Sequence, residues 1–315
     1  MITKPTVLVL GAGASKPYGF PTAPELIDRV LKSIEDDART RARLQKAAGG
    51  YGDEEIKEFA DKLKKFKEQD PSASIEDFLA SQDNYFRLGR SVIAQAILEC
   101  EHDNALSCGG PGAWYHLLVA RLWSGQPSVD QLELNQLKII TFNFDRSLER
   151  AIDRHLIGTF GESESEGLWQ KIPILHVHGQ LGRYSRHSDE SCECRRLYRP
   201  ETSAIEVERW SFALRLATDK DFRLQHERRK EQARQWLCSA ERVCFLGFGY
   251  GEENLKTLGF PEVLDDKDKH SVWGTCYQCG GILEKLRERT KERIQFADPN
   301  VDIAQFFQEH PELFQ

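Results

Sequence analysis

The sequence predicts an α/β fold in which a parallel sheet is interrupted by a helical insertion. Short apolar runs are each followed by glycine, asparagine, aspartate or histidine. Such runs are typical of buried parallel strands whose carboxyl ends form a ligand site. Between the first two runs, apolar residues recur instead at helical spacing.

The first strand and its loop lie in residues 7–22, VLVLGAGASKPYGFPT. The apolar run ends at Gly11, and Gly11 and Gly13 can let a ligand approach the backbone closely. A helix beginning near Pro24 would point free N–H groups toward a phosphate. This pattern predicts a dinucleotide-binding opening. Lys16 stands where a third glycine is expected, and no acidic residue closes a second strand about 20 residues on. A glycine turn that only connects strand and helix is therefore the alternative.

Helical spacing then continues as far as residue 132. Ser74 and Asp77 resemble a capping box that begins one of these helices. Residues 35–132 are therefore predicted to form a helical insertion. We expect further helices at residues 23–34, 91–100 and 113–123.

Parallel-sheet character returns after residue 132 and predicts four more strands. Ligands of open α/β sheets gather at the carboxyl ends of such strands. We expect a single domain, residues 1–315, whose sheet core is formed by residues 1–34 and 133–315. The later elements are expected as strands at residues 138–141, 173–177, 242–246 and 271–275, and a C-terminal helix at 281–292.

Composition limits the partners and the compartment. The net charge of −7 gives no general affinity for nucleic acid or for an anionic membrane. The basic run at residues 223–234 also contains glutamates and is interpreted as a solvated helix face. No apolar run approaches the roughly 18 residues that span a bilayer, and residues 1–5 leave no room for a signal peptide. The 8 scattered cysteines are typical of reduced thiols, so we expect a cytoplasmic protein.

Four short motifs follow one another in the order of the sirtuin (SIR2) signature. They are GAGAS at residues 11–15 with Gly19-Phe20-Pro21, TFNFD at 141–145, His178-Gly179, and LGFGYGEENL at 246–255. The chain thus resembles SIR2-like domains over most of its length. It is more similar to the bacterial antiphage-defence proteins that cleave NAD⁺ than to the deacylases. The resemblance implies a Rossmann-like parallel sheet of SIR2 type with an inserted helical subdomain.

Two departures from classical sirtuins support this finer placement. Classical sirtuins continue with Asp-Phe-Arg where this chain has Thr22-Ala23-Pro24. They also carry two Cys-x-x-Cys pairs soon after the His-Gly, whereas Cys192 and Cys194 follow here and Cys276 and Cys279 lie far downstream. A four-cysteine zinc site is possible in principle, but this spacing does not match the family module. Zinc is therefore not expected, and no metal ligand is assigned.

The resemblance implies that NAD⁺ is the substrate and that Asn143, His178 and Asp145 are catalytic. Cleavage of the bond between nicotinamide and ribose creates an oxocarbenium-like sugar. Asn143 would hydrogen-bond the ribose or the attacking water, and His178 would be the general base. Asp145 would orient the site or stabilise the developing positive charge. His176 is a supporting residue.

The resemblance also implies the residues that bind the rest of the nucleotide. Backbone N–H groups of the glycine loop would hold the diphosphate, and residues after the two later strands would lie near the adenosine. The loop set is Gly11, Ala12, Gly13 and Ser15; the adenosine set is Gly247, Tyr250 and Thr275; Pro21, Thr22 and Thr141 complete the nucleotide-binding residues.

Each catalytic candidate has a structural alternative. Asn143 could cap the next helix, because Asn favours that position. Asp145 could pair with Arg146 or Arg150. His178 could be an ordinary histidine at a strand end.

We expect an NAD⁺ glycohydrolase that releases nicotinamide and ADP-ribose, as a regulated effector of antiphage defence by NAD⁺ depletion. Because an unrestrained enzyme would harm its own cell, we expect an inactive resting state. A separate partner protein, a ligand, or homo- or hetero-oligomer assembly would release it. Two alternatives are a sensor that binds NAD⁺ or ADP-ribose without cleaving it, and an NAD-dependent protein deacylase. The sensor would need no base, and the departures above disfavour the deacylase.

Overall fold

The central element of the computed structural model is a sheet of six parallel strands. The structure describes residues 1–71, 74–107, 110–187, 195–200, 203–214, 223–264 and 269–315. The strands are β1 (Thr6–Leu10), β2 (Leu137–Thr141), β3 (Ile174–His176), β6 (Arg242–Leu246), β7 (Ser271–Gly274) and β8 (Gln295–Phe296). Their order, β3-β2-β1-β6-β7-β8, is that of dinucleotide-binding sheets. The predicted α/β fold with a parallel sheet is therefore confirmed.

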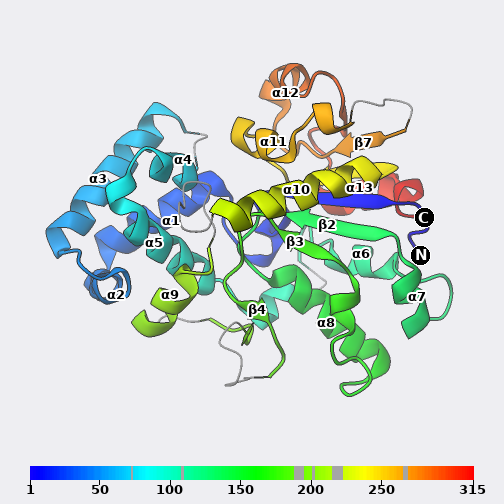
Figure 1. Ribbon diagram of the computed structural model, residues 1–315, viewed down its shortest axis with the longest axis horizontal. Coiled ribbons are helices and arrows are strands. Elements are labelled where there is room, and N and C mark those ends of the chain that lie inside the picture. Colours follow the sequence, from blue (N-terminus) through cyan, green and yellow to red (C-terminus); the bar gives the residue numbers. More distant parts are fainter. Residues whose placement is uncertain (72–73, 108–109, 188–194, 201–202, 215–222, 265–268) are drawn as a thin grey trace.

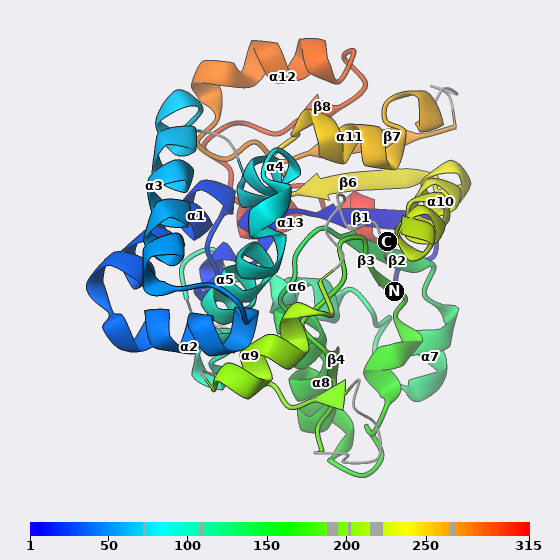
Figure 2. The same cartoon turned by 60° about the vertical axis from the view of Figure 1, so that its left-hand side comes forward.

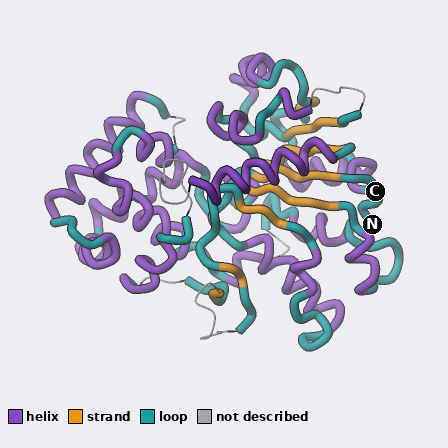
Figure 3. The backbone as a smooth tube through the Cα atoms, viewed as in Figure 1, coloured by secondary structure: helices purple, strands orange, loops and turns teal. Residues whose placement is uncertain are grey.

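Both faces of the sheet are buried, as the continuous apolar strands require. In β1, Leu8 and Leu10 belong to one hydrophobic cluster, whereas Val7 and Val9 belong to the other. Side chains alternate between faces along a strand, so these clusters are the two layers of the core. Figure 3 shows the strands side by side between layers of helices.

Five helices form a group beyond the carboxyl ends of the strands. The predicted insertion, residues 35–132, supplies four of them; the helix at residues 23–36 begins before it, and the helix at residues 115–120 within it packs on the sheet instead. In Figure 2 the arrow of β6 points toward this group, which lies to the left of the sheet in both Figure 1 and Figure 2. Its core is continuous with one face of the sheet. The predicted capping box at Ser74 and Asp77 is present. The group consists of α1 (Ala23–Asp36), α2 (Ala38–Ala48), α3 (Asp53–Gln69), α4 (Ile75–Ala80) and α5 (Phe86–Leu98).

Most of the remaining helices cover the sheet, whereas α9 packs on α2 and α5. Side chains of α6, α8 and α13 join the cluster on one face, and side chains of α10, α11 and α12 join the cluster on the other. Figure 1 shows α10 lying across the front of the sheet. The bounds are α6 (Tyr115–Ala120), α7 (Val129–Leu134), α8 (Ser147–Phe160), α9 (Ala204–Ser211), α10 (Arg223–Ser239), α11 (Glu252–Leu258), α12 (Leu283–Arg289) and α13 (Ile303–Glu309).

Some predicted elements differ in extent from the observed ones. The helix expected at residues 113–123 is the shorter α6, and the helix expected at 281–292 is α12. The strand β8, the helix α13 and a two-stranded sheet of β4 (Arg183–Tyr184) with β5 (Arg195–Arg196) were not predicted. The short strands contain only two residues each, too few for a periodic pattern.

The loop after β1 packs directly on the loop after β6. The amide of Gly11 donates to the carbonyl of Leu246 (3.1 Å), and the amide of Gly13 donates to the carbonyl of Gly247 (3.0 Å). A Cβ at Gly247 would lie 2.2 Å from the backbone nitrogen of Ala14, and the φ of Gly247 is +56°. Glycine is therefore required at residue 247 by both space and backbone conformation.

Replacing Gly247 by alanine is expected to lower the free energy of unfolding by about 2 kcal/mol or more, because backbone must move to admit the methyl group. The matched control is Gly249→Ala, since Gly249 has open space around it and no positive φ. Urea denaturation of both variants checks this. Equal stabilities for the two variants would contradict the close loop packing.

Candidate functional site

The candidate site lies where the carboxyl ends of β1, β2, β3 and β6 meet. The chain places Gly11 after β1, Asn143 after β2, His178 after β3 and Gly247 after β6. Thr141, the last residue of β2, accepts a hydrogen bond from the amide of Asn143 at its Oγ1 (3.1 Å). The sheet thus brings the residues singled out in the sequence to one edge, where such folds bind ligands.

Asn143 is held by its side-chain amide. Its Nδ2 donates to the carbonyl of Gly11 (3.0 Å) and to Oγ of Ser15 (2.9 Å). Its Oδ1 is buried and has no hydrogen-bond partner. The side chain does not cap α8, so the structural alternative for Asn143 is wrong. A buried acceptor without a partner costs free energy, so this oxygen is available to a ligand or a water molecule.

His176 fixes the backbone of Asn143. Its Nδ1 lies 2.9 Å from the carbonyl oxygen of Asn143, and its Nε2 lies 2.8 Å from Oε1 of Glu149. Burial lowers the pKa of His176, but the Glu149 carboxylate outweighs burial and raises the pKa above its usual value. With both ring nitrogens protonated, His176 donates to both acceptors. The turn that carries Asn143 is therefore anchored to α8.

His178, two residues on, has the opposite environment. Its ring packs edge-on against Phe142 and stacks on His226 of α10, with ring centroids 5.7 Å apart. Burial, together with His226, lowers the pKa of His178 to about 4. Its Nε2 lies 3.4 Å from Oδ1 of Asn254 in α11, and its buried Nδ1 has no partner. With that oxygen facing the ring, Nε2 carries the proton and Nδ1 presents a lone pair.

Asp145 begins a buried chain of hydrogen bonds. Its Oδ1 accepts from the amide of Ser147 (3.0 Å) and from the hydroxyl of Ser147. The Ser147 hydroxyl lies 2.7 Å from that of Tyr115, which lies 3.4 Å from that of Ser15. Ser15 in turn accepts from Asn143. Burial raises the pKa of Asp145.

The pairings proposed as the structural alternative for Asp145 are wrong. Arg146 is fully buried and bonds instead to Glu101, with Nη2 to Oε2 at 2.6 Å. Arg150 bonds to Asp103, with Nη2 to Oδ2 also at 2.6 Å. Asp145 is therefore a capping and hydrogen-bonding residue at the start of α8.

The glycine loop differs from the expected phosphate cradle. The amides of Gly11, Gly13 and Ser15 already donate to backbone carbonyls of the chain, and so does that of Ala14. Two short 3₁₀ turns lie between β1 and α1. Ala12 lies in the first of them. These four amides stabilise the loop itself, which leaves the Ala12 amide and groups outside the loop as the donors for a diphosphate.

Pro21 and Thr22 lie at the start of α1. Thr22 is its N-cap and forms a capping box with Glu25, whose Oε2 accepts from the Thr22 amide (2.9 Å) and hydroxyl (2.8 Å). Lys16 donates to the other carboxylate oxygen of Glu25 (2.7 Å). Thr22 therefore has a structural role in this conformation.

The three residues expected near the adenosine lie together but face inward. Tyr250 is 1% exposed, and its hydroxyl donates to the carbonyl of Thr275 (3.0 Å). Oγ1 of Thr275 accepts from the amide of Gly247 (2.9 Å). These contacts join the loops after β6 and β7. The Tyr250 ring packs in the core against Phe245 and Phe248, so it offers no free face to an adenine.

Sequence reasoning missed the residues that reach the site from other segments. Tyr115 and Ser147 belong to the buried chain, and His226 and Asn254 contact His178. Tyr18 also belongs to this set. Its ring stacks on Tyr115 with centroids 3.9 Å apart, and its hydroxyl accepts from the amide of Tyr115 and from that of Trp114, the N-cap of α6. One of these residues had a sequence signal. His226 lies seven residues before Ala233, a spacing that places both on one face of a helix, and both are buried in the structure.

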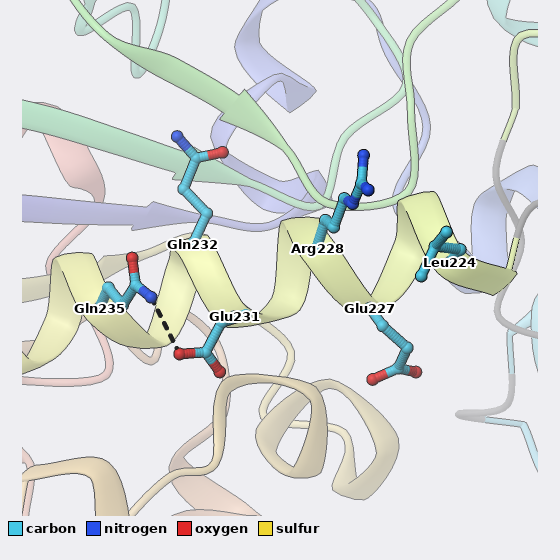
Figure 4. Close-up of a pocket in the computed structure, with 6 residues that line it drawn as sticks. All are labelled: Leu224, Glu227, Arg228, Glu231, Gln232 and Gln235. Carbon is cyan, nitrogen blue, oxygen red and sulfur yellow. Dashed lines mark hydrogen bonds between the residues drawn. The ribbon is translucent and has the colours of Figure 1, made fainter.

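A hollow on the surface lies elsewhere. Figure 4 shows its residues along one side of α10, where the Gln235 amide donates to Glu231. A single helix lines it, and neither Asn143 nor His178 takes part, so it is a surface feature distinct from the strand-end site. The lining residues are Leu224, Glu227, Arg228, Glu231, Gln232 and Gln235.

Within the described ranges, no three His, Cys, Asp or Glu side chains are grouped so that they could hold a metal ion. Cys192 and Cys194 lie outside those ranges. The same part of the chain contains no helix that is long and apolar enough to cross a membrane.

Comparison with known proteins adds no identity. No protein-family model matches the chain, and no curated protein matches it.

Replacing His178 by glutamine is expected to flatten the pH dependence of stability. Above pH 6.5 the histidine is neutral in both states, so its contribution is complete. Between pH 6.5 and about 4 the unfolded chain binds a proton that the folded chain does not, and stability falls. At pH 5.0 this loss is about 2 kcal/mol relative to pH 7.5.

Urea denaturation at the two pH values measures the difference. The control is His187→Gln, because the His187 side chain is 65% exposed. If wild type and His178→Gln lose the same stability on acidification, His178 is not a buried neutral histidine.

Proposed function

We propose that this protein is an NAD⁺ glycohydrolase, which cleaves NAD⁺ to nicotinamide and ADP-ribose. The observation that carries the proposal is a pair of buried, unpartnered acceptors, Oδ1 of Asn143 and Nδ1 of His178, at the ends of adjacent strands. A water or a ribose hydroxyl can donate hydrogens to such acceptors. The strand order supports a dinucleotide as the ligand.

In the proposed reaction, the bond between the ribose C1′ and the nicotinamide nitrogen breaks. The bonding electrons pass to the pyridinium ring and leave neutral nicotinamide, while the ribose becomes an oxocarbenium-like cation. Water adds to C1′ and its proton passes to Nδ1 of His178. Oδ1 of Asn143 holds the ribose or the water, and its partial negative charge stabilises the cation. Asp145 acts through the hydrogen-bond chain that positions Asn143.

The burial of this site supports the proposed regulation. Asn143 and His178 are each 9% exposed, and His226 of α10 stacks on the His178 ring. The ribose C1′ of a dinucleotide could come close to Asn143 and His178 only after residues around His178 move. We therefore propose a resting form that a separate partner protein, a ligand or oligomer assembly activates, in a role in antiphage defence by NAD⁺ depletion.

One observation favours a second candidate function. A pKa of about 4 makes His178 a weak base at neutral pH. A site that binds NAD⁺ or ADP-ribose without cleaving it would tolerate such a residue, so a sensor is the alternative.

The test is NAD⁺ consumption by the purified chain, alone and with the proteins encoded beside it. We expect His178→Ala and Asn143→Ala each to lower the rate at least about 100-fold, because each removes a group that acts on the reacting atoms. The control His187→Ala changes an exposed histidine and should keep the rate.

Other results would assign other functions. Tight binding of NAD⁺ without turnover under any condition would identify a sensor. Nicotinamide release that requires an acyl-lysine peptide would identify a deacylase.

A further inference from the structure

The strand-end site has acceptors in place but lacks an evident partner for a negatively charged ligand. Among the glycine-loop amides, those of Gly11, Gly13, Ala14 and Ser15 are already bonded within the protein. A dinucleotide carries two negative charges on its diphosphate, and these need donors or cations. With most of the loop amides occupied, a cation from another element would complete such a binding site.

Arg229 of α10 has the properties of that cation. Its Nη1 is buried without a hydrogen-bond partner, and no ion pair joins Arg229 to a carboxylate among the described residues. Its neighbour Lys230, in contrast, is paired with Glu227 (3.0 Å). Because the Arg229 side chain is half-buried and its Nη1 has no acceptor within the protein, this nitrogen is available to an anionic ligand.

Helical spacing places Arg229 on the face of α10 that packs on the sheet. His226, Ala233 and Leu237 are buried and mark the inward face of the helix. Arg229 lies three residues after His226 and four before Ala233, which places it on the same face. After burial and, for His178, the neighbouring His226, the positive charges of Lys230 and then Arg229 lower the pKa of both His178 and His226.

We propose that Arg229 binds the diphosphate group of the dinucleotide at this site. This inference rests on the proposed function for the identity of the ligand, but it concerns binding and not cleavage. Arg is suited to the role, because its planar fork gives two parallel hydrogen bonds to phosphate oxygens. The phosphates would lie beside α10, and the ribose of nicotinamide would lie toward Asn143.

The adjacent Arg228 provides a matched control. It is exposed and lines the outer hollow of α10 shown in Figure 4. Arg228→Gln and Arg229→Gln thus remove the same charge from the same helix on different faces. Isothermal titration with ADP-ribose and with inorganic pyrophosphate, carried out on the chain alone and with the proteins encoded beside it, measures binding in the resting and the activated form. Adenosine serves as a probe without phosphate.

We expect Arg229→Gln to weaken ADP-ribose and pyrophosphate binding roughly tenfold to a hundredfold, as for loss of a hydrogen bond to a charged group. Arg228→Gln should change both less than twofold, and neither variant should change adenosine binding. Arg229→Lys should fall between wild type and Arg229→Gln, because it keeps the charge but loses the fork.

Thermal unfolding of the ligand-free variants distinguishes a site residue from a structural one. Arg229→Gln should unfold at the wild-type temperature or above, because it removes an unpaired and partly buried cation. It should also lose most of the rise in melting temperature that ADP-ribose gives the wild type.

Several outcomes would overturn the inference. These are equal weakening by both variants, unchanged ADP-ribose affinity in Arg229→Gln, or no binding of either phosphate probe to wild type. Failure of the proposed function is separate: a wild type that binds ADP-ribose through Arg229 but never consumes NAD⁺ would retain this inference and lose the hydrolase activity.

Discussion

The arrangement of the site depends on a buried carboxylate. When ionised, Asp145 can only accept hydrogen bonds, so the Ser147 hydroxyl donates to it. Each hydroxyl then donates one step toward Asp145: that of Tyr115 to Ser147, and that of Ser15 to Tyr115. The oxygen of Ser15 is left to accept, and Asn143 meets it with its NH₂ group. Because the Ser15 oxygen and the Gly11 carbonyl both accept, the Asn143 NH₂ group faces them, and Oδ1 of Asn143 is the atom without a hydrogen-bond partner.

Two histidines on one strand show how environment separates similar residues. His176 ends β3 and contacts Glu149 of α8 on one face of the sheet, whereas His178 follows the strand and stacks on His226 of α10 on the other face. The carboxylate raises the pKa of His176, whose two ring nitrogens both face acceptors, and burial lowers the pKa of His178 to about 4, with its Nδ1 left without a partner. Titratable groups driven apart in this way are common where acid–base chemistry takes place.

Much of the framework follows from local sequence patterns. The strand from Arg242 to Leu246 and the capping box at Ser74 lie where apolar runs and capping residues predict them. These signals are local, so no knowledge of the tertiary fold is needed. The parallel sheet then brings the ends of its strands together, and the proximity of Gly11 and Asn143 follows.

The rest of the site depends on contacts between distant segments. Tyr115 reaches Ser15 across 100 residues, and His226 comes from a helix whose composition resembles a solvated face. Tyr250 illustrates the converse, because its motif indicated a ligand contact and its ring lies in the core. Which side chain fills which space depends on tertiary packing, and a short motif does not encode it.

His226, which stacks on the His178 ring, belongs to a different part of the chain from the residues that hold Asn143. Asn143 is anchored through its backbone by His176 and through its amide by Gly11 and Ser15, all on strand ends. His226 belongs to α10, whose side chains pack on the face of the sheet opposite to α8. Mutations in that helix can therefore retune access without disturbing the anchored groups. In the proposed hydrolase, access to the site would thus be set by a different part of the chain from the groups that act on NAD⁺.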